Sequence, residues 1–202
     1  MGRRLIAVKD LLPLETERLY FRRFTEADLE EMHSYQSRED YAQHAWRGPR
    51  TWEHSYRVIA EHRGPRAFVG DGDSVRYAFS PKGGDGELYG EIVLTLVDAE
   101  SKQIEMGWVV NPAYTGQGLA KEAATAAIRA VFERLGAHRV FARLDALNVS
   151  SAKVCERLGM RREAELKQSH YQLGEWRDEY IYAILAHELL GPEAAQSVAE
   201  QP

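Results

Sequence analysis

The sequence predicts an α+β fold in which helices flank a mixed, mostly antiparallel central sheet. Three central segments are rich in β-branched and aromatic residues and are separated by turn sequences: 74–80, 88–98 and 103–110. This spacing is typical of an antiparallel meander. A long helical pattern and a further strand at 138–146 follow the last of them. A strand-helix-strand unit requires a parallel pair, here the strands at 103–110 and 138–146. We expect a ligand cleft where the two strands of this pair diverge.

The N-terminal part predicts one strand followed by two helices. Residues 18–24 alternate as in a strand, and Thr25 is expected to cap the helix after it, in which Leu29 and Met32 share a face. A second helix is expected near 51–62.

The C-terminal half predicts two helices and three strands. The stretch NPAYTGQGLAKEAATAAI, residues 111–128, opens a helix that continues to about Leu135 and stops at Gly136. After the strand at 138–146, we expect a helix from about Ser150 to a stop at Gly159. Strands near 160–168 and 177–186 then meet at a turn around Gly174.

Length and composition indicate one globular domain. A chain of 202 residues with 44% hydrophobic and 28% charged side chains has the balance of a folded protein rather than a disordered one. We expect the domain to span residues 1–190 and a flexible tail to span 191–202. No apolar run approaches the ~18 residues of a membrane span, and the start of the chain lacks the pattern of a signal peptide. A cytoplasmic location is therefore expected.

The chemistry-bearing residues exclude several kinds of site. Cys155 is the only cysteine, which excludes an internal disulfide and a cysteine-based zinc cluster, and the seven histidines lack HxxxH or HExxH spacing, so we expect no metal. The net charge of -5 argues against a broad nucleic-acid surface and favours an amine-bearing small partner.

The glycine pair Gly116 and Gly118 stands between a strand and a helix. Such a turn leaves backbone N–H groups without internal partners at the positive end of the helix dipole, where phosphate binds readily. The competing interpretation is a plain tight turn before a small-residue packing helix. Neither GxxxxGK[ST] nor GxGxxG after a first strand is present, so nucleoside triphosphates and dinucleotides are not indicated.

A second motif, NVSSAKVCERLGM at residues 148–160, opens the next helix. Taken alone, Asn148 and the serines after it are either helix caps or functional groups.

Taken together, the two motifs resemble those of the GNAT N-acetyltransferase superfamily. TGQGLAKEA at 115–123 is similar to the acetyl-CoA motif R/Q-x-x-G-x-G/A, and the segment at 148–164 resembles its companion N-x-x-S…E-x-L-G-F. The segments 15–32, 103–118 and 173–185 further resemble the branch of the ribosomal-protein-alanine N-acetyltransferases (RimJ/RimL-like). The resemblance runs from about Thr16 to Glu188 and is loose between 40 and 70.

The resemblance implies a site for acetyl-CoA as the acyl donor. Pyrophosphate would lie on the backbone amides of the glycine turn, and the pantetheine arm would meet the main chain of the preceding strand. The cofactor-binding residues expected in this way are Val109, Val110, Gly116, Gln117, Gly118, Leu119, Ala120 and Asn148, the last as an orienting amide. Thr115 departs from the Arg or Gln that opens the family motif.

The resemblance also suggests two catalytic residues. Many superfamily members carry a tyrosine acid at the position of Cys155, which we expect to be a buried small hydrophobe instead. Ser151 is then expected to protonate the departing sulfur. Glu105 matches an acid of the central strand and is expected to take the proton of the amine, directly or through water; the alternative for Glu105 is a solvent-facing strand residue.

The sequence does not determine which amine accepts the acetyl group. Lesser candidates for contacts to it are Glu91, His44, His170 and Tyr171, with Trp46, Trp52 and Trp176 as walls; ordinary surface or core roles are the default for each. The leading function is N-acetylation of a primary amine, such as a protein or peptide α-amine. The alternatives are a small-molecule acetyltransferase for polyamines or aminoglycoside-like compounds and a non-catalytic CoA-binding regulatory module. Neither nucleic acid nor membrane is an expected partner, and a homodimer is compatible with the sequence.

Overall fold

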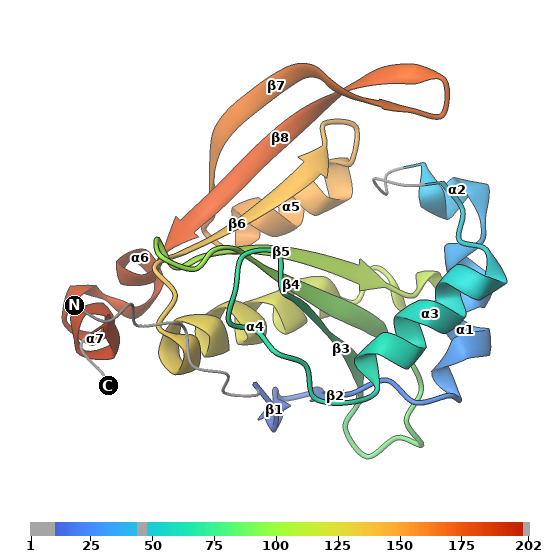
Figure 1. Ribbon diagram of the computed structural model, residues 1–202, viewed down its shortest axis with the longest axis horizontal. Coiled ribbons are helices and arrows are strands. Elements are labelled where there is room, and N and C mark those ends of the chain that lie inside the picture. The colour runs from blue at the N-terminus through green and yellow to red at the C-terminus, as the bar shows by residue number, and fades with distance from the viewer. Residues whose placement is uncertain (1–10, 44–47, 200–202) are drawn as a thin grey trace.

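An eight-stranded sheet forms the centre of the computed structural model, which describes residues 11–43 and 48–199 (Figure 1). The strands lie in the order β1-β2-β3-β4-β5-β6-β8-β7. Their bounds are β1 Leu14–Glu15, β2 Leu19–Arg22, β3 Ser74–Pro81, β4 Gly90–Asp98, β5 Gln103–Val110, β6 Arg139–Asp145, β7 Arg161–Gln172 and β8 Glu175–Leu185. Every neighbouring pair is antiparallel except β5 and β6. The predicted α+β class, the meander and the parallel pair are therefore confirmed.

Helices cover both faces of this sheet. Their bounds are α1 Asp28–Gln36, α2 Glu39–Ala42, α3 Trp52–His62, α4 Leu119–Leu135, α5 Val149–Arg157, α6 Ala186–Leu190 and α7 Pro192–Ala199, and a 3-10 turn, η1, spans Pro112–Tyr114. The long helix α4 and its neighbour α5 pack on one face, whereas α1 and α3 pack on the other.

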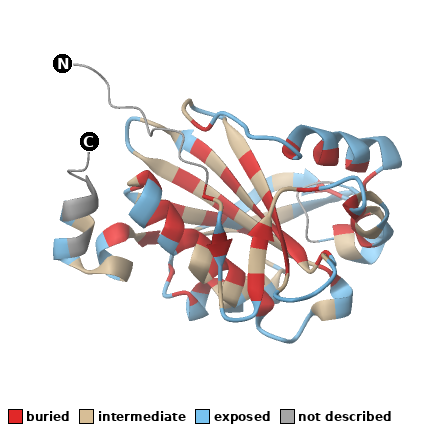
Figure 2. Ribbon diagram, turned by 90° about the horizontal axis from the view of Figure 1, so that it is seen from below, coloured by how far each residue is buried: buried red, intermediate tan, exposed pale blue. Residues whose placement is uncertain are grey.

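The larger core lies between the sheet and α4. The buried stripe of α4 is built mainly from alanines, such as Ala123, Ala124 and Ala127, which let its backbone approach the strands closely. Every second residue along the strands, such as Ile92 and Ile104, packs in the same core as this stripe. Figure 2 shows the resulting buried bands along the strands. A smaller core on the opposite face joins α1 and α3 to β3.

The central parallel pair is short and then separates. β5 and β6 are in register only at Gln103↔Arg139, Ile104↔Val140 and Glu105↔Phe141, although β5 continues to Val110 and β6 to Asp145. In Figure 1 the two strands diverge from this common start. The main chain of residues 106–110 on the β6 side is thereby left available to another molecule, as the predicted splay requires.

Several local elements differ from the expectations. Helix α1 begins at Asp28, so the prediction that Thr25 is its N-cap is wrong: the Asp28 carboxylate instead accepts the N–H and the hydroxyl of Thr25 at 2.6 Å and 3.1 Å. Strand β1 and helices α2 and α6 were not predicted. In the segment expected to be a flexible tail, the structure has helix α7, whose Ala195 packs against the larger core.

Within the described ranges, none of the helices combines the length and the apolar character that crossing a bilayer requires.

Candidate active site

A cleft of about 810 Å³ opens where β5 and β6 diverge. Its walls come from β3, β4, β5 and β6, from the first turn of α4, from α5, and from Arg38, Asp40, Tyr41 and Arg50. Of the predicted cofactor-binding residues, the lining includes Val109, Val110, Gly116, Gly118, Leu119, Ala120 and Asn148. Two motifs that are about thirty residues apart in the sequence therefore meet in one site.

The glycine turn has a backbone conformation that suits an anion. Gly116 and Gly118 have φ angles of 78° and 77°, which place both in the left-handed region that side-chain-bearing residues avoid. Gly118 is the N-cap of α4 and no side chain caps this helix. The first N–H groups of α4 therefore lack helical partners and face the cleft side of the turn, where the helix dipole adds positive potential.

A salt bridge from Arg18, which immediately precedes β2, braces this turn. Arg18 donates from Nη1 to the carbonyl oxygen of Gln117 at 3.1 Å and pairs with Glu122 of α4 at 2.5 Å. Glu122 also accepts the hydroxyl of Thr16 and the N–H of Arg18, and these bonds together lower the pKa of its carboxyl against the opposing effect of burial. The exposed side chain of Gln117 is not part of the cleft wall, so this residue is expected to act through its backbone.

Thr115 lines the cleft, but its hydroxyl is directed locally. It donates to the carbonyl oxygen of Pro112 at 3.0 Å and so closes η1. The departure from the Arg or Gln of the family motif therefore leaves a turn-stabilising residue in this place. The backbone amides that follow are unaffected.

Three cations on α4 and α5 were missed by sequence reasoning. Lys121 follows the glycine turn on α4, and Lys153 and Arg157 stand four residues apart on α5; all three line the cleft. Helical spacing was the available signal, because positions i and i+4 lie on one face of a helix. Together with the amides, these cations make this end of the cleft fit a ligand with several phosphate groups.

Asn148 and Ser151 occupy the start of α5. The Asn148 side-chain oxygen accepts the N–H of Ser151 at 3.0 Å and the hydroxyl of Ser150 at 2.8 Å, so the capping interpretation of Asn148 holds. Its amide nitrogen makes no hydrogen bond within the described ranges and remains able to donate into the cleft. The hydroxyl of the half-buried Ser151 is likewise without a partner among the described residues and lies on the cleft wall.

Cys155, on the same helix, faces the larger core and is fully buried. Burial raises the pKa of its thiol to about 12. The expectation of a small buried hydrophobe is thereby confirmed, and Cys155 is not among the described residues that line the cleft.

Glu105 lies at the last paired position of β5, where the two central strands begin to separate. Its carboxylate is half-buried, does not belong to the cleft lining, and has no hydrogen-bond partner in the described part of the chain. Burial raises the pKa of Glu105, Arg143 opposes this rise, and Glu179 adds to it. The carboxylate stands where the two central strands begin to separate rather than on the wall of the cleft.

Glu91 of β4 is a stronger candidate than the sequence indicated. It is fully buried, lines the cleft, and accepts from Arg76 Nη1 at 3.2 Å and from Gln36 Nε2 at 3.4 Å. Pairing of β4 with β5 places Glu91 opposite Val109, on the same sheet face as Glu105. A single glutamate in a strand carries no local sequence signal of a cleft position. Its hydrogen-bond partner Gln36 is 55 positions away in the sequence.

The other predicted acceptor contacts do not meet at the cleft. Trp52, Trp176 and Tyr171 are exposed, and neither they nor His170 belong to the described lining, so Trp52 and Trp176 have surface positions rather than the default core positions. His44 and Trp46 lie outside the described residues. The aromatic walls are instead Tyr41, Trp108 and Tyr114, of which Tyr114 stacks on Tyr89 at a centroid distance of 3.9 Å.

The hairpin of β7 and β8 contacts helix α2. Gln172 at its turn donates from Nε2 to the carbonyl oxygen of Ala42 at 3.0 Å, which joins the hairpin to α2. Figure 1 shows the hairpin reaching beyond the sheet toward that helix.

Known proteins share both the sequence pattern and the fold. A model of the acetyltransferase (GNAT) domain matches residues 18–161. The chain is 31% identical over 180 residues to the uncharacterized N-acetyltransferase YnaD of Bacillus subtilis (strain 168), in a match that covers 87% of this chain and 98% of YnaD.

Three solved structures are similar. A GNAT-family acetyltransferase from Bacillus anthracis superposes with a TM-score of 0.77 at 32% identity, covering 87% of this chain and 99% of the other. Spermidine N-acetyltransferase from Vibrio cholerae, in complex with CoA and spermine, gives 0.74 at 18% identity and covers 87% and 99%. RimL, a ribosomal L7/L12 α-N-protein acetyltransferase in complex with coenzyme A, gives 0.70 at 18% identity and covers 84% and 95%. The last two similarities concern the fold alone. With a family model that matches most of its length, this chain belongs to the GNAT acetyltransferase family.

Proposed function

We propose that this acetyltransferase moves the acetyl group of acetyl-CoA directly onto a single primary amine, with the α-amine of a peptide or protein N-terminus as the leading acceptor. The observation that carries this proposal is the diverging pair β5 and β6, which opens beside the glycine turn of α4 and the serine-bearing first turn of α5. The V. cholerae spermidine enzyme and RimL, which share the fold, are both described with coenzyme A.

Acetyl-CoA would lie along the cleft from the helix starts to the sheet. The amides of residues 116–120 would bind its pyrophosphate, and Lys121, Lys153 and Arg157 would neutralise the phosphate charges. The unpaired edge of β5 at Val109 and Val110 would take the pantetheine arm by strand-like hydrogen bonds. The thioester would then lie between that edge and α5.

Ser151 is proposed as the acid. When the amine attacks the thioester carbonyl and the carbon–sulfur bond breaks, the departing sulfur needs a proton. The Ser151 hydroxyl has no partner among the described residues and lies on the wall that the thioester would face, so it is available to donate.

A glutamate on the opposite strand pair is proposed to take the proton from the amine. Glu105 is the residue expected from the sequence, and burial raises its pKa, which increases its affinity for a proton. It stands away from the cleft wall and would act through water. Glu91 does line the wall and would hold the ammonium form of the acceptor beside Arg76 before deprotonation.

The charge of the cleft favours an acceptor with one amine over a polyamine. Among the described residues, the lining toward the acceptor holds four cationic side chains, Arg38, Arg50, Arg76 and Arg143, against two acidic ones, Asp40 and Glu91, since Lys121, Lys153 and Arg157 would face the cofactor phosphates. Both acids already bind arginines, Asp40 to Arg38 at 2.5 Å and Glu91 to Arg76 at 3.2 Å. A polyamine brings several positive charges into this positive field, whereas an α-amine brings one.

Acceptor profiling tests the proposal. The purified chain is incubated with acetyl-CoA and, in parallel, a peptide with a free N-terminus, the same peptide with a blocked N-terminus, and spermidine. The readouts are the mass of the acceptor, measured by mass spectrometry, and the free thiol of the CoA that is released. We expect acetylation of the free N-terminus and at least about tenfold slower reaction with spermidine. Preferred acetylation of spermidine overturns the acceptor class, and CoA binding without turnover on any amine supports the non-catalytic module instead.

Two variants test the assigned roles. Ser151→Ala and Glu105→Gln should each lower kcat by about 10²-fold or more while the Kd for CoA stays unchanged. Matched controls are Ser34→Ala on the exposed side of α1 and Glu133→Gln, whose carboxylate pairs with Arg129 on the surface of α4. Unchanged turnover in both active-site variants would refute the assignment.

A further inference from the structure

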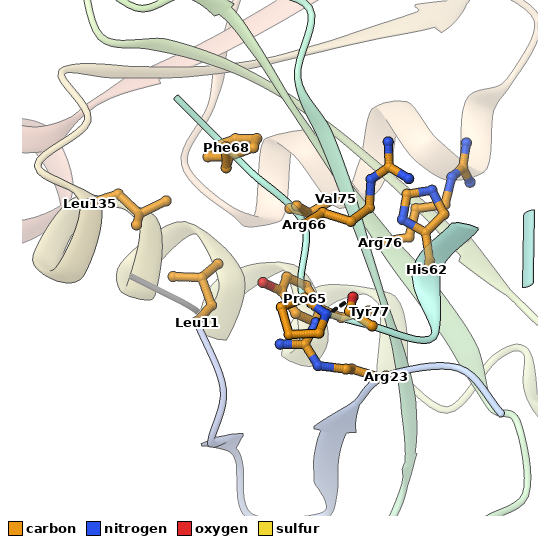
Figure 3. Close-up of a pocket in the computed structure, with 11 residues that line it drawn as sticks. Leu11, Arg23, His62, Pro65, Arg66, Phe68, Val75, Arg76, Tyr77 and Leu135 are labelled. Carbon is orange, nitrogen blue, oxygen red and sulfur yellow. Dashed lines mark hydrogen bonds between the residues drawn. The ribbon is translucent and has the colours of Figure 1, made fainter. Parts of the chain in front are cut away.

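A second cavity, of about 200 Å³, lies beside the part of β3 that β2 leaves uncovered. β2 pairs with β3 only over Ala78–Pro81, so the edge at residues 74–77 meets the segment 64–68 instead. The walls come from the start of the described chain, the end of α3, that segment, β3 and the end of α4 (Figure 3). The cavity is separate from the glycine turn and from both proposed catalytic residues.

The cavity has an apolar end and a basic end. Leu11, Phe68 and Leu135 gather at one side in Figure 3, while the nitrogen-bearing side chains of Arg66, Arg76 and His62 lie at the other. None of the described residues that line it is acidic. A ligand for this cavity would therefore need one apolar part and one electron-rich part.

Arg23 and Arg66, two of the arginines that line the cavity, donate to backbone oxygens. Arg23 donates to the carbonyl oxygen of Gly64 at 2.9 Å, which fixes the loop that forms one wall. Arg66 donates from Nη1 to the carbonyl oxygen of Glu61 at 3.0 Å and has no carboxylate partner among the described residues. Its guanidinium thus retains donors for an anion.

His62 adds a buried polar group aimed into the cavity. It is only 7% exposed, and its ring makes no hydrogen bond to any residue that the structure describes. Burial, with the positive charges of Arg76 and Arg66, lowers the pKa of His62 to about 4, against a smaller opposing effect of Glu91. The neutral imidazole at pH 7 therefore carries one unused donor and one unused acceptor. Neither ring nitrogen is among the described side-chain atoms that are both fully enclosed and unpaired, so both are accessible to a molecule in the cavity.

We infer that this cavity binds a small organic anion, namely a monocarboxylate with a short apolar tail, through the imidazole of His62 and the guanidinium groups of Arg66 and Arg76. Its tail would pack among Leu11, Phe68 and Leu135. A cavity of 200 Å³ holds about seven water-sized groups, which matches a carboxylate with a chain of about five carbons.

Occupancy of this cavity would act on the acceptor end of the active site through Arg76. Arg76 lines both spaces and donates to Glu91 Oε1 at 3.2 Å. A carboxylate that accepts hydrogen bonds from the Arg76 guanidinium weakens the bond between Arg76 and Glu91. The charge beside the acceptor amine changes as a result. The binding inference stands without the proposed function, whereas this regulatory consequence rests on it.

Pentanoate is the probe, with pentanamide as its uncharged analogue and acetate as its tail-free analogue. Isothermal titration should give one saturable pentanoate site with a Kd of about 1 mM or tighter, and at least about tenfold weaker binding of both analogues. NMR titration of the His62 ring should show its pKa rising when pentanoate is bound, because a nearby anion favours the imidazolium. The absence of saturable pentanoate binding up to about 10 mM, or equal binding of pentanamide, overturns the inference.

A pair of surface arginine variants locates the site. Arg66→Gln should weaken pentanoate binding about tenfold, since it removes one charge-assisted contact. Arg63→Gln is the control, because Arg63 pairs with Glu26 and does not line the cavity. Both variants should bind CoA as the unmodified chain does, which reports on folding and on the active site independently. Pentanoate binding that is unchanged in Arg66→Gln, or equally weakened in Arg63→Gln, contradicts this location.

Discussion

Gly118→Ala is the most informative change at the glycine turn. Gly118 has a φ of 77° and caps α4, and a methyl group built on it meets only the Arg18 guanidinium, at 3.9 Å. Space is therefore not the constraint. The constraint is the left-handed backbone conformation, because an alanine in that conformation costs about 1–2 kcal/mol.

That strain should appear in cofactor binding. An alanine at position 118 relaxes by leaving the left-handed region, which turns the following N–H groups away from the place of the pyrophosphate. Restoring the turn on binding costs the same 1–2 kcal/mol, so the Kd for CoA should rise about 5- to 30-fold.

Calorimetric titration of CoA measures this rise, and Gly174→Ala is the matched control. Gly174 joins β7 to β8, has a φ of 85°, and has nothing within 4 Å of an added methyl group. It should lose similar stability in thermal unfolding and keep its CoA affinity. The reasoning is refuted if Gly118→Ala binds CoA as tightly as the unmodified chain, or if both variants lose affinity equally.

Three further predictions concern the supports of the site. Arg18→Ala removes the donor to the Gln117 carbonyl and should raise the Kd for CoA about fivefold, measured by the same titration; an unchanged Kd contradicts a bracing role. Lys153→Met should flatten the salt dependence of CoA affinity, and an unaltered slope would exclude a phosphate contact. Burial raises the pKa of Glu105 above its unfolded value, so the stability linked to its protonation is present at low pH and lost as pH rises through the folded pKa. Glu105→Gln should therefore melt above the unmodified chain at pH 7, with a gap that closes toward pH 4; melting scans at both pH values check this, and a gap of opposite sign contradicts it.

The parts of this protein that the sequence predicted are those encoded locally. Strand periodicity, the alanine-rich helix with its stop at Gly136, and the glycine turn each depend on neighbours within a few residues. The parallel pair followed from connectivity alone, because an intervening helix forces the return strand to run in the same direction.

The parts that it did not predict depend on contacts between distant segments. Glu91 becomes a cleft residue only because α1 brings Gln36 to it, and Trp52 and Trp176 are exposed because the elements that carry them present those positions to solvent. Thr25 failed as a cap because the Arg22–Asp28 salt bridge, at 2.6 Å, fixes Asp28 at the helix start. The cationic cleft in a chain of net charge -5 was equally hidden, since charge totals carry no position.

A crystal structure of the chain with CoA tests the central claim most directly. It should place the pyrophosphate oxygens within hydrogen-bond distance, about 2.7–3.2 Å, of the backbone nitrogens in residues 116–120, with the pantetheine arm along the open edge of β5 and its sulfur beside Ser151. Phosphates bound away from the glycine turn, or a pantetheine arm outside the gap between β5 and β6, would contradict the account.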